Sequence, residues 1–350
     1  MNQVLEPESQ QAMTGGCPCV SIVIPTYNRG TLLLETLASL LAQPYRPLDV
    51  LIVDDGSTDD TPGLARQWIR ERACDPGLRW RVLVRDNRGA SAARNHGLAQ
   101  ATGAYIHFLD SDDLVGPYFY TTLVAVMEHA TECSFASGGW LSAEKAAAIG
   151  ELPDPRLAVP VRAQTIPHNA WCGLFRTSML PPDLRWDETL INHNDWNFTT
   201  RFLLANPKLL LQVPIPLLVY RTHTGVERLG RIRSPDSLRA ALHATDRLAR
   251  LAISNNRYRR ALRVRFSTEY ITLLHAAMQN GTRPLQFQAA RGVIRHATFR
   301  QAAFWNGIAV ILLLLLPFTR SAACAWALRR IRLWFGDTQL TVEVDERSLT

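Results

Sequence analysis

The fold is decided by the stretch Val20-Ser21-Ile22-Val23-Ile24-Pro25, a short run rich in β-branched residues that ends at a proline. Such a run predicts a buried strand. Apolar residues then recur at helical spacing from Leu33 to Leu41, which predicts a helix that ends before Pro44. A second apolar run, Asp49-Val50-Leu51-Ile52-Val53, predicts the next strand. A strand, a helix and a strand at this spacing indicate a parallel unit.

The same alternation continues along the chain. We expect strands at 81–84 and 104–109, a helix beginning near Thr61, and another from Ser91 to Ala101. This order predicts an α/β fold with a doubly wound, mostly parallel sheet and flanking helices. Ligands of such sheets bind beyond the carboxyl ends of the strands. The chain has no Gly-x-Gly-x-x-Gly after its first strand and no Gly-x-x-x-x-Gly-Lys-Ser/Thr, so dehydrogenases and phosphate-loop NTPases are disfavoured.

Charge is spread unevenly over the 350 residues. The whole chain carries +7, but residues 229–335 hold 18 arginines, no lysine and three acidic residues, which leaves the rest near −8. Such asymmetry indicates two regions with different partners. An acidic body suits a metal and a nucleotide held through it, whereas a basic tail suits anionic lipid. A nucleic-acid partner is not expected, since no motif that reads nucleic acid is recognisable.

Three carboxylates follow the last predicted strand, in Phe108-Leu109-Asp110-Ser111-Asp112-Asp113. If the chain were extended there, Asp110 and Asp112 would point to the same side. Crowded carboxylates raise one another's pKa unless a cation lies between them, and oxygen ligands suit Mg²⁺ or Mn²⁺. The alternative is a turn and helix N-cap leading to Pro117, where Asp is common. Taken alone, the motif leaves both interpretations open.

Two further polar clusters also end predicted strands. In the first, Asp54 or Asp55 could accept hydrogen bonds from a base or ribose, or could simply shape a turn. In the second, small residues would let a ligand approach the backbone, and Arg88 or Arg94 could neutralise phosphate, although a packed helix start has the same composition. The clusters are Asp54-Asp55-Gly56-Ser57-Thr58-Asp59 and Asn87-Arg88-Gly89-Ala90-Ser91-Ala92-Ala93-Arg94-Asn95.

Together with Pro25-Thr26-Tyr27-Asn28-Arg29, these clusters stand in an order and spacing that resembles the family-2 glycosyltransferases, inverting enzymes with the GT-A fold. The resemblance is clear over 20–114 and traceable to about residue 228. It implies an N-terminal tail (1–19), a GT-A domain (20–228), an arginine-rich helical region (229–335) and a C-terminal tail (336–350). Within the GT-A domain, 20–115 would bind the nucleotide sugar and 116–228 the acceptor.

The resemblance also implies residue roles. The metal, Mn²⁺ or Mg²⁺, would be held by Asp112, with Asp113 and His223 as further ligands; Asp110 and Asp112 form the Asp-x-Asp pair. His223 lies in Tyr220-Arg221-Thr222-His223, where a surface histidine is an equal alternative. The residues expected to bind the donor are Pro25, Tyr27, Asp54, Asp55, Asn87, Arg88, Gly89, Arg94 and Asp110.

An inverting transfer also needs a general base for the acceptor hydroxyl. In the family this is the Asp of a Glu-Asp pair, and Asp195 matches its place, although Asn194 replaces the usual Glu. A helix cap is the alternative role. The processive signature Gln-x-x-Arg-Trp is absent after Asp195, which favours transfer of one sugar at a time. With the resemblance, we expect a UDP-sugar as the donor and a glycan or lipid-linked acceptor. A nucleotidyltransferase or a non-catalytic sugar-nucleotide-binding protein is the alternative function.

The arginine-rich region contains an apolar run of about 17 residues, 302–318, with arginines on both sides. That length is at the lower limit for a membrane span, and equal basic flanks fit better with a helix lying in the interface. A buried helix and a single span stay open as alternatives. The start of the chain lacks a secretory pattern. We therefore expect a cytoplasmic protein, peripheral at the inner face of the membrane.

Overall fold

The computed structural model describes residues 16–72, 75–149, 161–162, 170–190, 194–205, 209–221, 234–254, 266, 269–274, 276–277 and 283–296. His223 and the apolar run 302–318 lie outside these residues. The elements are β1 (Val20–Thr26), α1 (Gly30–Leu41), β2 (Leu48–Asp54), α2 (Thr61–Arg72), β3 (Leu78–Val84), α3 (Ala90–Gln100), β4 (Tyr105–Phe108), β5 (Leu114–Val115), α4 (Phe119–His129), β6 (Cys133–Ser142), α5 (Ala143–Ile149), β7 (Val161–Arg162), β8 (Gly173–Arg176), α6 (Asn194–Ala205), β9 (Leu209–Tyr220), α7 (Pro235–Ser254) and α9 (Arg283–His296).

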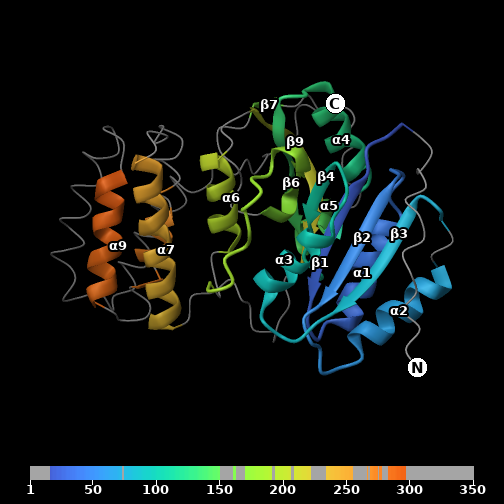
Figure 1. Ribbon diagram of the computed structural model, residues 1–350, viewed down its shortest axis with the longest axis horizontal. Helices are drawn as coiled ribbons and strands as arrows, with labels where there is room; N and C mark the ends of the chain where they lie inside the picture. Colours follow the sequence, from blue (N-terminus) through green and yellow to red (C-terminus); the bar gives the residue numbers. More distant parts are fainter. Residues whose placement is uncertain are drawn as a thin grey trace.

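One sheet organises the N-terminal two thirds of the protein (Figure 1). Its order is β3-β2-β1-β4-β8-β6-β9-β5, with β7 paired to β9. The first four strands run parallel, as predicted. Beyond β4 the sheet is mixed, because β8 is antiparallel to β4 and β6, while β6 and β9 are parallel. The predicted α/β class and helical C-terminal region are confirmed, but parallel pairing dominates only in the first half.

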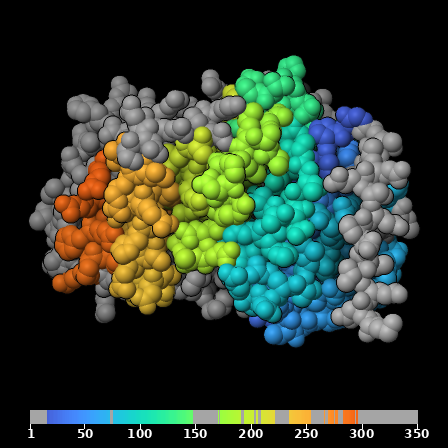
Figure 2. Space-filling model, in the orientation of Figure 1, coloured from blue at the N-terminus to red at the C-terminus, as the bar shows by residue number. Residues whose placement is uncertain are grey.

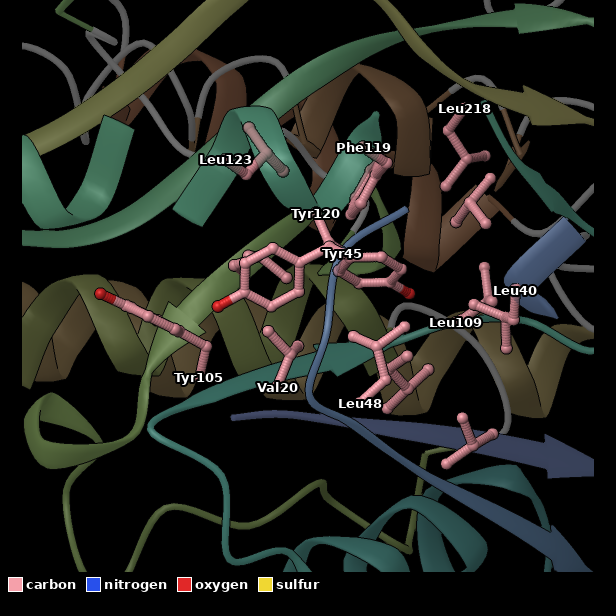
Figure 3. Close-up of a cluster of buried hydrophobic side chains, with 14 of the residues drawn as sticks. Val20, Leu40, Tyr45, Leu48, Tyr105, Leu109, Phe119, Tyr120, Leu123 and Leu218 are labelled. Atoms are coloured by element: carbon pink, nitrogen blue, oxygen red, sulfur yellow. The ribbon is translucent and has the colours of Figure 1, made fainter. Parts of the chain in front are cut away.

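Alternation along β1 explains why the sheet is covered on both faces. Val20, Ile22 and Ile24 face a core formed with α1, α2 and α4, whereas Val23 faces a second core formed with α3 and α6. Every residue of β1 is buried, and alternate residues pack on opposite faces of the sheet, as expected for a strand covered on both faces. Figure 3 shows the first core, where Tyr45, Phe119 and Tyr120 gather with leucines above the strands.

The C-terminal helices form a third core of their own. Leu238 and Leu242 of α7, Tyr270 and Leu274, and Leu285 of α9 are buried against one another. Trp196 and Leu204 of α6 join this cluster, while Phe198 and Phe202 of the same helix join the core beneath the sheet. Helix α6 therefore lies between the two parts, as Figure 1 shows. Among the described helices, none has the length and hydropathy needed to cross a membrane.

Gly97 sets how closely α3 packs on the sheet. A Cβ at this position would lie 2.3 Å from Cγ1 of Val23 and 3.2 Å from Cγ2 of Val53. Both valines are buried, and β-branched side chains cannot rotate away easily. The glycine therefore lets α3, which carries Arg94, lie directly against β1 and β2.

We predict that Gly97→Ala destabilises the protein by about 1–3 kcal/mol, since the overpacking outweighs the ~1 kcal/mol that alanine gains in helix propensity. Urea unfolding measures the change. Ala99→Leu is the control, because Ala99 is exposed on the same helix and should shift stability by less than about 0.5 kcal/mol. A Gly97→Ala protein as stable as the parent would contradict the close packing.

Candidate functional site

Parallel pairing brings the predicted polar clusters to one edge of the sheet. Thr26 at the end of β1 is in register with Asp54 at the end of β2, and Asp54 with Val84 at the end of β3. The acidic segment follows β4, which pairs with β1 on its other side. The loops that carry the predicted donor and metal residues thus leave neighbouring strands at the same edge.

The acidic segment is a turn and not an extended strand. The N–H of Asp113 donates to the carbonyl of Asp110 at 3.2 Å, so the expectation that Asp110 and Asp112 align by strand alternation is wrong. The turn gathers the carboxylates instead: an oxygen from each of Asp110, Asp112 and Asp113 lies within 4.8 Å of the others. Both interpretations of the sequence therefore hold in part, since the motif is a turn and also an acidic cluster.

This cluster fits a divalent cation. Asp113 is fully buried, and its Oδ2 has no hydrogen-bond partner among the residues that the structure describes. Burial, reinforced by the negative charges of Asp110 and Asp112, raises the pKa of Asp113 well above its usual value. A cation among the three groups would remove this penalty, and carboxylate oxygens are the ligands that Mg²⁺ and Mn²⁺ prefer.

Two arginines compensate part of this negative charge. Arg29, after β1, forms an ion pair with Asp112. Arg94, on α3, contacts Oδ1 of Asp110 at 2.6 Å and is only 7% exposed. Burial alone would lower the pKa of Arg94, but Asp110, Asp195 and Asp112 together raise it above its usual value. Arg94 therefore stays charged in the protein interior because carboxylates surround it.

Asp195, the predicted base, affects the pKa of Arg94 through its negative charge. Asp195 lies in the first turn of α6, 101 positions along the chain from Arg94, and is half-buried. Its negative charge is the second largest carboxylate contribution to the pKa of Arg94, after Asp110. The predicted base is therefore close enough to Arg94 to act on its pKa, and Arg94 contacts Asp110 of the acidic turn.

The second acidic cluster shapes loops. Asp54 accepts hydrogen bonds from the N–H and the hydroxyl of Ser57. Asp55 accepts from the N–H groups of Arg88 and Gly89, at 3.2 and 2.6 Å. Both carboxylates are buried, so their first task is to hold the loops that follow β2 and β3.

The other predicted donor residues differ in exposure. Pro25 is buried within β1, whereas Tyr27, just beyond that strand, is 43% exposed. Asn87 and Arg88 are exposed. Gly89 has a φ of +91°, which favours glycine, and the space where its Cβ would lie is open. A ligand can thus approach the backbone at the start of α3.

Arg221 is a residue that the sequence analysis quoted but gave no role. It is the residue after β9, and its backbone N–H donates to Oδ1 of Asp113 at 3.1 Å. Its guanidinium donates to the carbonyls of Asp112 and Leu32, to Thr36 and to Glu35. Arg221 therefore ties the acidic turn to α1.

Trp186 is a residue that the sequence analysis missed. Its ring lies 4.5 Å from the guanidinium carbon of Arg94 and is stacked on Phe198 of α6, with centroids 4.4 Å apart. Its backbone exchanges two hydrogen bonds with the side chain of Asn95. One loop residue thus joins α3, which carries Arg94, to α6, which carries Asp195.

A cavity of about 610 Å³ opens beside this loop, and the acidic turn does not line it. It is bounded by Val84, Arg85, Asp86, Arg88, Ala92, Asn95, His96 and Glu188. Arg88 and Glu188 form an ion pair across its rim at 2.8 Å.

Comparison with known proteins agrees with this arrangement. Residues 21–145 match the profile of glycosyl transferase family 2. Over this stretch the chain is similar to this family. The family-2 match covers β1 to α5, and thus the acidic turn and Arg94 but not Asp195.

Relatives extend the likeness. The chain is 28% identical to the uncharacterized glycosyltransferase YibD of Escherichia coli over 61% of its own length and 64% of that protein. It is 40% identical to the putative teichuronic acid biosynthesis glycosyltransferase TuaG of Bacillus subtilis over 29% and 38%. The chain thus spans less than two thirds of each relative. The S. aureus TarS 1–349 structure in complex with UDP-GlcNAc shares the fold, with a TM-score of 0.59 and 18% identity over 81% of this chain and 83% of that one.

We predict that Trp186→Leu destabilises the protein by about 3 kcal/mol, because it removes a fully packed ring. Trp186→Phe, which keeps an aromatic face under Arg94, should cost about half as much. Urea unfolding compares the two with Trp80→Leu, a half-buried tryptophan on the edge strand β3. Equal losses for Leu and Phe at position 186 would show that the aromatic face contributes nothing.

Proposed function

We propose that the protein is an inverting glycosyltransferase that moves a single sugar from a UDP-sugar to an acceptor hydroxyl. The observation that carries the proposal is the convergence of Asp110, Asp112 and Asp195 on the buried Arg94. A donor site built on strand ends and a carboxylate from the acceptor half facing it are the two parts that such a transfer needs.

The donor would be held at the sheet edge. The open backbone at Gly89 and the exposed groups of Tyr27, Asn87 and Arg88 would contact the nucleotide. Asp54 and Asp55 would act by fixing the loops that carry these contacts. TarS binds UDP-GlcNAc on the same fold, which supports a uridine nucleotide as the donor class.

A divalent ion, held by Asp112 and Asp113 with Asp110 beside it, would offset the charge that grows on the leaving diphosphate. His223, which follows Arg221 by two residues in the sequence, stays a predicted further ligand. Arg94 is positioned to pair with phosphate oxygens, because its guanidinium already lies among the anionic groups of the site.

Asp195 would accept the proton of the attacking hydroxyl. Its charge acts on Arg94, which contacts Asp110 of the acidic turn, and an inverting transfer needs a base for the acceptor hydroxyl. The likeness to TuaG supports an acceptor in cell-surface polysaccharide synthesis. We place the protein at the inner face of the cytoplasmic membrane, where a lipid-linked acceptor would be reached.

The donor class can be tested by thermal shift with UDP-, GDP- and dTDP-sugars, each with and without Mn²⁺. We expect UDP-sugars to raise the Tm of the parent protein only with Mn²⁺. In Asp112→Asn the Mn²⁺ concentration needed for this shift should rise at least about tenfold, because one charged ligand is lost. Asp60→Asn, at an exposed aspartate of the β2–α2 loop, is the control. An unchanged Mn²⁺ requirement in Asp112→Asn would remove Asp112 from the metal site.

The base is tested by Asp195→Asn. We expect the rate of acceptor-dependent UDP release to fall about 10²–10⁴-fold. The donor Kd, measured by calorimetry, should change by less than about twofold. Asp183→Asn, at an exposed aspartate of the same half, should keep the parent rate. Loss of donor affinity in Asp195→Asn would reassign this residue to the nucleotide site, and an unchanged rate would exclude it as the base.

A further inference from the structure

Helix α9 has one face fixed inward and one face open. Leu285, Ala289 and Val293 are buried in the C-terminal core. Gly292 brings the helix so close to Tyr270 that a Cβ would lie 2.2 Å from its ring. The rotation of α9 about its own axis is therefore set by packing, and the residues on its other side must face outward.

The outward face is basic and carries one aromatic ring. Arg283, Phe287, Arg291 and Arg295 follow one another at four-residue intervals, and all four are exposed. Residues at this spacing lie along one side of a helix. Phe287 is 51% exposed, and the 14 residues of α9 include no acidic residue. An aromatic side chain thus lies within a row of positive charge.

The positive face continues onto α7. Burial and the neighbouring Asp246 raise the pKa of Tyr270, while Arg295 of α9 and Arg250 of α7 both act in the opposite direction. Both arginines therefore lie near the same hydroxyl. Leu251, the next residue of α7, is 44% exposed. Figure 2 shows α7 and α9 side by side at the surface of the helical end.

These arginines are not used to hold the fold together. On α7, Arg239 pairs with Asp236 and Arg247 pairs with Asp187. Within the part of the chain that the structure describes, no ion pair involves Arg250, Arg283, Arg291 or Arg295. All four side chains are exposed.

We propose that the outward face of α9, together with Arg250 of α7, docks the protein onto an anionic membrane surface. Arginines there pair with lipid phosphates, and Phe287 enters the boundary between headgroups and acyl chains. Sequence continuity favours a bilayer over a soluble polyanion, because the apolar run 302–318 begins six residues after α9 ends. The docking face lies at the helical end, beyond α6 from the sheet (Figure 1).

The test is co-sedimentation of the full chain with vesicles, without donor or metal, so that its result does not depend on the proposed activity. Vesicles of phosphatidylcholine and phosphatidylglycerol in equal parts are compared with pure phosphatidylcholine. We expect binding to the anionic vesicles alone. Arg283→Gln/Arg291→Gln/Arg295→Gln should lower the partition coefficient about a hundredfold, and Phe287→Ser several-fold even at low salt.

The matched control is Arg66→Gln/Arg70→Gln/Arg72→Gln, which removes the same charge from exposed positions of α2 on the catalytic half. It should change partitioning by less than about threefold, since these charges lie away from the docking face. If both triple variants lost the same amount of vesicle binding, the effect would depend on net charge alone and the proposal would be overturned. Parent-like binding by the α9 triple variant, equal binding to both vesicles, or full displacement by short double-stranded DNA would each overturn it as well.

Discussion

The structure depends on charge compensation around one buried guanidinium. Arg94 carries its charge at 7% exposure, and carboxylates from two distant parts of the chain offset the cost of burying it. The converse also holds, since Asp110 and Asp112 could not share a turn with the buried Asp113 without cations beside them. The positive charge of Arg94 and the negative charges of the carboxylates therefore stabilise one another.

Apolar packing places these charges. Gly97 lets α3 lie on β1 and β2, Trp186 supports the guanidinium from below, and Phe198 stacks on that ring from α6. Arg221 holds the acidic turn against α1 from the other side. The polar groups are therefore held by rigid elements on every side, which is the condition for a site to keep its geometry when a ligand enters.

The first strands and helices could be predicted from the sequence, because their patterns depend on residues that are close together in the chain. The strands β1 to β4 and helices α1 to α3 follow from periodicity, because each buries apolar residues at its own spacing. The acidic cluster could be recognised in the sequence. Strand alternation does not explain why its carboxylates lie together, because a hydrogen bond from the N–H of Asp113 to the carbonyl of Asp110 turns the chain there. The prediction that these carboxylates bind metal, and that Asp195 is a base, stays a prediction.

Contacts between distant segments could not be predicted. Nothing near Trp186 in the sequence indicates that its ring lies under Arg94, since 91 residues separate it from Asn95, which holds its backbone. The antiparallel strand β8 has only four residues, which are too few to give a periodic signal in the sequence. Its place between β4 and β6 is set by its hydrogen bonds to those two strands. Arg221 was visible in a quoted motif, yet its role depends on where β9 ends relative to α1.

The uneven charge of the chain acquires a structural meaning from these contacts. In the half that contains the sheet, Arg29 and Arg94 form ion pairs with carboxylates of the acidic turn. On α9 the arginines form no ion pair with the described residues and are exposed, whereas Leu285, Ala289 and Val293 are buried in the core. Because α6 contributes Trp196 to the helical core and Phe198 to the core beneath the sheet, the two halves are joined by one helix, and that helix also carries Asp195. Helix α6 therefore connects the helical core to the core beneath the sheet through packed side chains.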